Sequence, residues 1–293
     1  MSGQLKEVRN RIKSVGSTQQ ITKAMKMVSA AKLRRAQDSI IQMRPYARKL
    51  QDMLSNIVSS ASGDMSLPLA DTRTVEKVLL IPITSDRGLC GAYNSNVIKL
   101  TRATIAEKYA EQDKKGNVTI LPLGKKAWEF FNRYNFKTVN DFWEVFSDLS
   151  FDNVRNAAVY AQKAFLNKEF DRVEIIYSQF RNAATQEFVV EPYLPIQKIE
   201  QKKGAKNNDF IYEPSKEELL LELMPKILNT QVYKAILDAN ASEHGARMTA
   251  MDKASENANE MLKGLKISYN RARQAAITTE LTEIVSGAAA LQG

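Results

Sequence analysis

The sequence predicts a central α/β domain flanked by two long helices that pair with each other as an antiparallel coiled coil. Three observations support this fold class. Apolar residues recur every three or four positions at both ends of the 293-residue chain, strand-like and helix-like segments alternate in the middle, and all eight prolines lie between positions 45 and 225. We therefore expect an N-terminal coiled-coil helix over 1–60, an α/β domain over 61–210 and a C-terminal coiled-coil helix over 211–293.

The first segment has coiled-coil spacing with two interruptions. Its apolar positions step by three and four residues, and the phase of the repeat changes near Gly16 and Lys32. Pro45 lies inside the repeat and predicts a kink or a new helix start, because proline lacks the N–H that a helix interior needs. The expected seam positions are Leu5, Val8, Ile12, Val15, Ile21, Met25, Val28, Ala36, Ile40, Met43, Ala47, Leu50, Leu54 and Ile57.

The last segment repeats this spacing with small residues alternating with large ones, which lets two helices approach closely. The two terminal helices are separated by one domain, so they pair most simply with each other. The stretch from Leu281 to Leu291 is nearly uncharged, and a helix that is apolar on most faces needs a cover. If nothing in this chain covers it, a partner must. The expected seam positions are Met248, Met251, Ser255, Ala258, Leu262, Leu265, Tyr269, Ala272 and Ala276.

The middle of the chain alternates between strands and helices, which predicts a mainly parallel, Rossmann-like sheet. Segments 172–180 and 186–194 are strands joined by a short turn and predict a hairpin, and 201–210 predicts an exposed loop. The other expected elements are strands over 75–83 and 117–122 and helices over 92–113, 125–134 and 151–168.

The net charge is concentrated in the first 60 residues. They hold 12 Lys and Arg against 3 Asp and Glu, which accounts for the whole net charge of +9. Such a surface suits an acidic partner, either nucleic acid, anionic lipid or an acidic protein, or it is a solvated helix face. The chain has no apolar run of about 20 residues, as a membrane-spanning helix needs, and its start lacks the apolar core of a signal peptide.

The residues themselves predict no catalytic, cofactor or metal site in this chain. A single Cys and a single His exclude an intrachain disulfide, a CxxC zinc site and the common multi-histidine metal sites. The turn Ser85–Gly91 follows a strand and opens a helix, where glycine-rich loops bind phosphate, but its two glycines favour a tight structural turn. Cys90 as a nucleophile needs a histidine base, and His244 lies on a different expected element.

Four motifs, taken in chain order, are more specific than composition. They are Ile21–Val28 (ITKAMKMV), Ser85–Gly91 (SDRGLCG), Ala246–Asp252 (ARMTAMD) and Tyr269–Leu281 (YNRARQAAITTEL). Together they closely resemble the gamma-subunit family of F-type (F1Fo) ATP synthases, of the bacterial type. The resemblance covers in effect the whole chain, although residues 95–210 match only in pattern.

The resemblance implies a non-catalytic central rotor shaft, present in one copy per complex. In this family the helix pair turns inside a ring of three alpha and three beta subunits, while the α/β domain and the epsilon subunit seat on the membrane-embedded c-ring. Proton flow turns the c-ring, and the asymmetric shaft takes the beta sites through different affinities. The chain itself is expected to bind no cofactor, because ATP, ADP and Mg are bound by the alpha and beta partners. The expected location is the cytoplasmic side of the bacterial cell (inner) membrane, reached only through the complex.

The resemblance also assigns roles to residues. Arg273 and Gln274 match residues that hydrogen-bond a catch loop of beta, and Met25 matches a position close to the beta lever. Lys23 and Lys26 are expected to face acidic loops of that lever. The apolar tip is expected to turn in the upper sleeve of the ring, where sliding apolar contacts give no strong angular trap. Its residues are Ile284, Val285, Ala288, Ala289 and Leu291.

Two other classes of function stay open on the sequence. A basic coiled-coil protein that binds nucleic acid would show steeply salt-dependent DNA binding, although this basic cluster lacks interleaved aromatic residues. A nucleotide-dependent enzyme built on the α/β domain would be stabilised by ATP or NAD.

Overall fold

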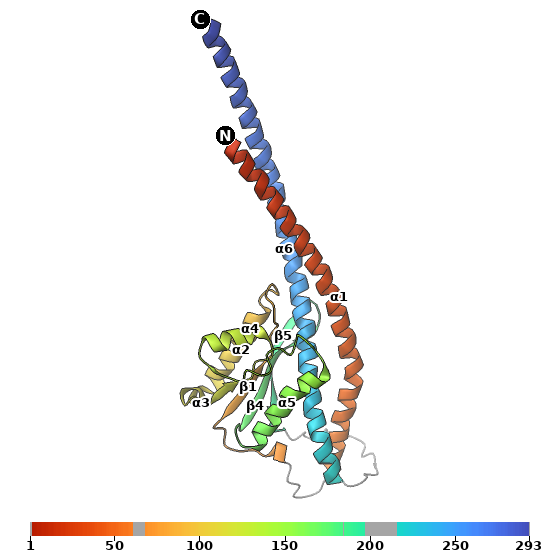
Figure 1. Ribbon diagram of the computed structural model, residues 1–293. Helices are drawn as coiled ribbons and strands as arrows, with labels where there is room; N and C mark the ends of the chain where they lie inside the picture. The colour runs from red at the N-terminus through yellow and green to blue at the C-terminus, as the bar shows by residue number, and fades with distance from the viewer. Residues whose placement is uncertain (1, 61–67, 184, 197–215, 293) are drawn as a thin grey trace. The chain divides into compact units, whose positions relative to one another are not determined.

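The computed structural model of the protein describes residues 2–60, 68–183, 185–196 and 216–292. Two very long helices, α1 and α6, come first and last in the chain, and shorter helices and strands lie between them (Figure 1). The elements are α1 (Ser2–Ser60), η1 (Pro68–Ala70), β1 (Val78–Pro82), α2 (Tyr93–Lys108), α3 (Ala110–Lys114), β2 (Val118–Ile120), α4 (Lys125–Arg133), β3 (Lys137–Thr138), α5 (Phe151–Leu166), β4 (Arg172–Phe180), β5 (Gln186–Leu194) and α6 (Lys216–Gln292).

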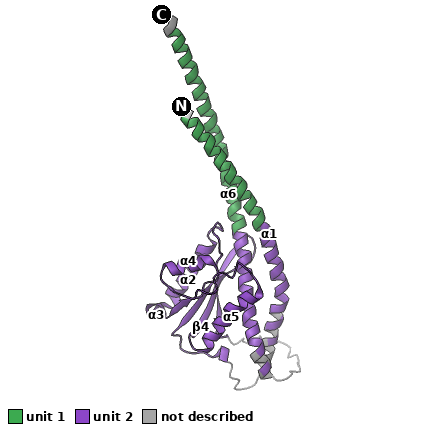
Figure 2. Cartoon of the chain, viewed as in Figure 1, with its two compact units in different colours: residues 1–29, 247–293 green, residues 30–246 purple. Residues whose placement is uncertain are grey.

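The chain forms two compact units, which Figure 2 colours separately. Unit 1 comprises residues 1–29 and 247–293 and is a pair of helix segments, whereas unit 2 comprises residues 30–246 and contains the sheet. Long terminal helices around a central α/β region confirm the predicted fold class. The expected segment limits after residues 60 and 210 lie at residues outside the described ranges, and they stay a prediction.

A five-stranded sheet forms the centre of unit 2, with the strand order β3-β2-β1-β4-β5. The first four strands in this order are parallel, and β5 pairs antiparallel with β4 in the expected hairpin. The strand β1 is buried at every position, because helices cover both faces of the sheet. The prediction of a mainly parallel sheet is confirmed.

The structure differs from the expected elements in two places. The helix expected over 92–113 is divided at Tyr109, whose φ of −129° is not helical, into α2 and α3. The strand β3 has only two residues, too few to show the alternation that identifies a strand. The loop expected over 201–210 lies outside the described residues.

The helix α1 runs without a break through Pro45, so the predicted new helix start is wrong. Proline removes the hydrogen bond to the carbonyl four residues earlier, which belongs to Ile41. Pro45 is exposed and Ile41 is 62% exposed, so water can hydrate that carbonyl and the helix continues. The helix α6 likewise contains Pro225 in its first part.

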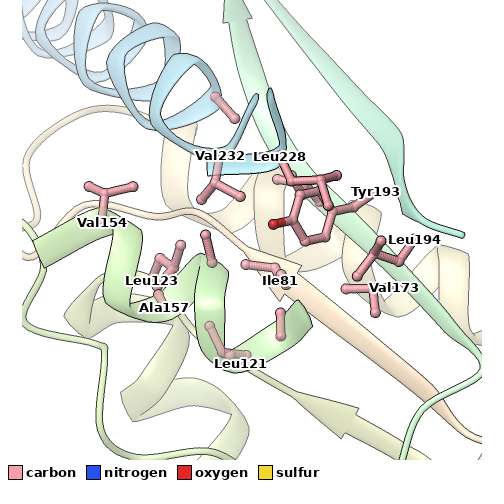
Figure 3. Close-up of a cluster of buried hydrophobic side chains, with 14 of the residues drawn as sticks. Ile81, Leu121, Leu123, Val154, Ala157, Val173, Tyr193, Leu194, Leu228 and Val232 are labelled. Atoms are coloured by element: carbon pink, nitrogen blue, oxygen red, sulfur yellow. The ribbon is translucent and has the colours of Figure 1, made fainter. Parts of the chain in front are cut away.

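Unit 2 buries apolar side chains on both faces of the sheet. On one face α5 and residues 223–239 of α6 pack over the strands (Figure 3), and on the other face α2 and α4 do so. Successive residues of β1 alternate between the two clusters, as strand geometry requires. The residues labelled in Figure 3 are Ile81, Leu121, Leu123, Val154, Ala157, Val173, Tyr193, Leu194, Leu228 and Val232.

The turn after β1 caps the start of α4. Thr84 Oγ1 accepts a hydrogen bond from Ala127 N at 2.8 Å, and Asp86 Oδ1 accepts one from Lys125 N at 3.0 Å. Two of the N–H groups that a helix start leaves unpaired are therefore satisfied by another element. Gly124 has a φ of 113°, and a Cβ there would lie 2.1 Å from Thr84 O. The cap therefore requires glycine at this position.

We expect Gly124→Ala to lower the free energy of unfolding by about 2–4 kcal/mol, because it adds a steric clash to an unfavourable backbone conformation. Gly116→Ala is the matched control, since Gly116 also has a positive φ of 70° but open space around it. It should cost only about 1–2 kcal/mol. Urea unfolding followed by circular dichroism measures both, and equal losses would contradict the proposed clash.

Asp238 of α6 is a buried carboxyl in unit 2, 4% exposed. Burial raises its pKa to about 6, while Lys234, Arg44 and Arg181 oppose the shift and Glu191 adds to it. The folded chain therefore holds this proton more tightly than the unfolded chain, whose Asp has a pKa near 3.8. This contribution to stability is greatest below about pH 4 and is lost as the pH rises through about 6.

We expect Asp238→Asn to remove this pH dependence. Between pH 4 and 7 the unaltered chain should lose about 2–3 kcal/mol of unfolding free energy relative to the variant, because about two pKa units separate the folded and unfolded states. Asp141→Asn, at an exposed loop position, is the control and should keep the slope of the unaltered chain. Urea unfolding across this pH range measures the effect, and parallel profiles for all three proteins would rule it out.

Candidate functional site

Unit 1 consists of residues 2–29 of α1 and 247–292 of α6, lying side by side (Figure 2). Side chains of the two segments bond at three places along their length. The bonds pair Arg9 with Tyr269, Thr22 with Ser255 and Lys26 with Asp252. Residue numbers on α6 fall as those on α1 rise, so the helices are antiparallel, as predicted.

The predicted seam on α6 is the face that the pairing buries. All nine predicted positions are buried or half-buried, and Met251 and Ala258 are the most enclosed at 5% and 7% exposure. Exposed residues such as Lys253 and Asn257 lie between them. The sequence prediction for this helix is confirmed.

The seam on α1 agrees with the predicted one from Leu5 to Val15 and from Ala36 to Leu50 and differs between these stretches, while the side chains of Leu54 and Ile57 lie outside the described set. Ile21 and Val28 were expected in the seam, but they are 57% and 56% exposed. The steps of three and four instead continue past Gly16 and Lys32 with no change of phase. Buried or half-buried residues that follow this spacing are Val15, Gln19, Thr22, Lys26, Ser29 and Leu33, and Gly16, Met25 and Ala30 beside them are half-buried as well. The prediction is wrong here because it followed apolar residues, whereas the seam passes through polar ones.

Two of these polar residues bond to α6. The hydroxyls of Thr22 and Ser255 share a hydrogen bond of 2.7 Å, and Lys26 Nζ lies 2.5 Å from Asp252 Oδ1. The ion pair is about 40% exposed and so contributes on the order of 0–1 kcal/mol. Polar pairs in a seam chiefly specify register, because sliding one helix along the other would break the bonds from Thr22 to Ser255 and from Lys26 to Asp252. These four residues are called the polar layer below.

The side of α1 away from the polar layer carries an exposed apolar strip. Ile21, Met27 and Val28 are 57%, 68% and 56% exposed. Ile21 and Val28 are seven residues apart and share one helix face, to which the half-buried Met25 also belongs. Lys23 is exposed nearby. This strip offers apolar contact together with positive charge to a partner.

The other predicted contact residues divide into two groups. Arg273 and Gln274 are exposed on α6, next to the half-buried seam residue Ala272. Lys26 directs its ammonium group to Asp252 in the same chain, so part of its charge is already paired. Lys23 and Met25 are two residues apart and project about 200° apart around α1, so they lie on different sides of that helix. Arg273 and Gln274 lie on the other helix, much farther along the pair.

The tip of α6 extends past the start of α1. The register of the three bonds places Ser2 opposite the region of Ala276, so later residues lack α1 as a partner. Every side chain described from 280 to 289 is exposed, including Ala288 and Ala289. Ile284 and Val285 are 67% and 66% exposed. Leu291 belongs to the same helix, but its side chain lies outside the described set.

The remaining candidate residues take part in internal contacts. In the turn Ser85–Gly91, Ser85 N donates to Asn94 Oδ1 at 2.9 Å, so this amide is already bonded. Cys90 is 2% exposed, and His244 Nδ1 lies 2.7 Å from Glu243 Oε2. Among the described residues there is no group of three or more His, Cys, Asp or Glu that could hold a metal ion. In the same part of the chain, no helix has an apolar stretch long enough to cross a membrane.

Comparison with known proteins relates nearly the whole chain to a single family. A family model described as ATP synthase matches residues 4–291. The ATP synthase gamma chain of Cytophaga hutchinsonii is 52% identical over 98% of both chains. Those of Flavobacterium psychrophilum and Chlorobium phaeobacteroides are 50% and 48% identical, each over 99% of both chains.

Solved structures share the fold. A chain of the OSCP/F1/c-ring part of the Euglena gracilis mitochondrial ATP synthase aligns with a TM-score of 0.68 and 21% identity, covering 99% of this chain and 95% of that one. A chain of the Tetrahymena thermophila central stalk and c-ring aligns with a TM-score of 0.56 and 25% identity, covering 80% and 99%. With one family model over nearly its whole length and relatives about half identical from end to end, the chain belongs to the ATP synthase gamma-chain family.

Proposed function

We propose that this chain is the central rotor shaft of a proton-translocating ATP synthase. It couples proton-driven rotation of the c-ring to conformational changes at the catalytic beta subunits and performs no catalysis itself. The observation that carries this proposal is the helix pair of unit 1, whose α6 tip and α1 strip are apolar and exposed. Apolar helix surfaces of this kind need an enclosing partner.

The partners follow from this role. One copy of the chain stands in a ring of three alpha and three beta subunits, and its α/β region contacts the epsilon subunit and the c-ring. The Euglena and Tetrahymena neighbours are described as parts of F1/c-ring and central stalk/c-ring assemblies, which supports this arrangement. ATP, ADP and Mg bind to the alpha and beta partners and none binds to this chain. The complex holds the chain at the cytoplasmic side of the bacterial cell membrane.

The coupling rests on the different chemistry of the sides of the helix pair. Met25 is half-buried at the edge of the exposed strip of α1 and Lys23 projects from another side of that helix, while Arg273 and Gln274 project from α6. Each orientation of the shaft presents a different side to a given beta subunit, and it stabilises the beta conformation that binds that side best. Lys26 is partly exposed and adds positive charge to the side of α1 that faces the beta subunits. Its bond to Asp252 also keeps the two helices in register.

The exposed tip of α6 supplies the bearing. Ile284, Val285, Ala288 and Ala289 present small and branched apolar groups, and Leu291 extends the same run of sequence. Apolar contact is non-directional, so rotation in an apolar sleeve breaks no hydrogen bonds. No observation favours the nucleic-acid alternative, and the family assignment does not support it.

Assembly tests the proposed function. Expressed with the other subunits, the chain should co-purify at one copy per three alpha and three beta subunits and should restore proton-coupled ATP synthesis. Ile284→Asp/Val285→Asp should block assembly, because the sleeve would bury two charges, while leaving the thermal unfolding of the isolated chain unchanged. The control Asn257→Asp/Asn259→Asp adds the same charges at exposed positions outside the tip and should assemble normally. Normal assembly of the tip variant would contradict the bearing role.

The catch-loop contact gives a second test. We expect Arg273→Ala/Gln274→Ala to lower ATP-driven proton pumping about fivefold to tenfold, because hydrogen bonds to a charged group contribute about 1.5 kcal/mol or more. Lys253→Ala/Asn257→Ala removes a similar cation and amide from exposed positions of α6 and should pump normally. Quenching of a pH-sensitive dye in membrane vesicles measures pumping. Unchanged pumping in the first variant would reject the assignment of these two residues.

A further inference from the structure

The two long helices are held very differently within unit 2. Every side chain of α6 from 228 to 246 is buried or half-buried, so the helix is enclosed on all sides. The α1 segment of the same unit buries one stripe only, and exposed residues such as Arg34 and Arg35 flank it. The buried residues of that stripe are Leu33, Ala36, Ile40 and Leu50.

Four elements of the α/β region form hydrogen bonds with the enclosed part of α6. Tyr93 of α2 donates from its hydroxyl to Ala239 O at 3.1 Å, and Ser242 Oγ donates to Ser178 O of β4 at 3.1 Å. Gln162 of α5 donates to Asn229 Oδ1 at 2.9 Å. On β5, Glu191 Oε1 and Pro192 O accept from Gln231 Nε2 at 2.7 and 3.2 Å.

These bonds are placed so that they resist both rotation and sliding of α6. From Asn229 to Ser242 they span about 20 Å of helix, and Gln231 and Ser242 lie about 200° and 220° around the axis from Asn229. A helix bonded on opposite sides cannot roll without breaking one set of bonds. Apolar packing has no such directionality, and it is what holds α1 here. Among residues 30–47, 49, 50 and 53, whose side chains are described, the side-chain hydrogen bond that forms joins Ser39 to Arg35 inside α1 itself.

Gly245 brings the hairpin against the same stretch of α6. A Cβ at this position would lie 3.1 Å from Ala183 O, which is closer than about nine in ten real contacts of a Cβ atom. The absence of a side chain lets the turn between β4 and β5 pack directly on the helix backbone. Glycine costs about 1 kcal/mol in a helix interior, so the close contact offsets a loss of helix propensity.

We infer that the α/β region grips the shaft through hydrogen bonds to α6, and that α1, which is held by apolar packing at Leu50 and Met53, is carried along by the seam. The residues Tyr93, Gln162, Asn229, Gln231 and Ser242 are called the α6 clamp, and we assign them as positioning residues for torque transfer. The inference rests on the proposed function, since the clamp transmits torque only if the chain is a rotor shaft. The inference adds a specific point to the proposed function: torque enters the helix pair through α6, at the hydrogen bonds of the α6 clamp.

The test compares two double variants in the complete, membrane-reconstituted complex. Tyr93→Phe/Ser242→Ala removes two hydroxyls of the clamp and no apolar atoms from the rings or helix. The control Thr101→Val/Ile40→Val removes a buried hydroxyl that bonds only within α2, and a methyl group from the α1 stripe. ATP hydrolysis and ATP-driven proton pumping are measured on each, together with hydrogen exchange of the amides in 236–246.

The clamp variant should assemble and hydrolyse ATP but pump fewer protons per ATP, while exchange in 236–246 becomes about tenfold faster. The control should keep its pumping ratio. Normal pumping by the clamp variant despite faster exchange, or an equal loss in the control, would overturn the inference. Should the double variant fail to fold, Tyr93→Phe alone decides by the same two readouts. Failure of the unaltered chain to assemble or to support ATP synthesis would instead refute the proposed function.

Discussion

The uninterrupted heptad repeat of α1 is the constraint on which the rest of unit 1 depends. One face of this helix, stepping by three and four residues from Leu5 onward, must be covered along its length, and α6 supplies the cover in antiparallel direction. Once the Thr22–Ser255 hydrogen bond fixes the register, the ends of the pair are fixed as well. The start of α1 then determines where the exposed tip of α6 begins.

The helix α6 meets three environments in turn, and its sequence follows them. Residues 228–246 are enclosed by the α/β region and are apolar or hydrogen-bonded nearly all round. From 247 to 279 a single seam suffices, so charged residues such as Lys253 return between the seam positions. From 280 to 289 every side chain is exposed, although Ile284 and Val285 are apolar. Exposure of these apolar side chains to water is unfavourable, and an apolar sleeve around the tip would remove that exposure.

The proposed mechanics need stiffness, attachment and asymmetry, and separate groups of residues provide each. Seam packing makes the helix pair stiff, and the α6 clamp attaches it to the α/β region. Asymmetry comes from unlike sides, with the apolar strip at Ile21 and Val28 on α1 and the exposed Arg273 on α6. In the proposed mechanics, the basic excess of the first 60 residues would add long-range attraction to acidic partner loops.

The sequence alone determined the helix pair, its α6 seam, the strands β4 and β5 and the apolar tip, because each of these shows a repeating pattern of side chains. It also placed the proposed contact residues, although by resemblance and not by geometry. Only the tertiary structure showed the polar layer, since Thr22 and Lys26 lack the apolar signal that marks a seam. The tertiary structure also revealed three other features: the continuation of α1 through Pro45, the Thr84 cap on α4 and the α6 clamp. The physical reason is shared: burial and hydrogen bonding of a polar group depend on partners distant in the chain, which no local pattern records.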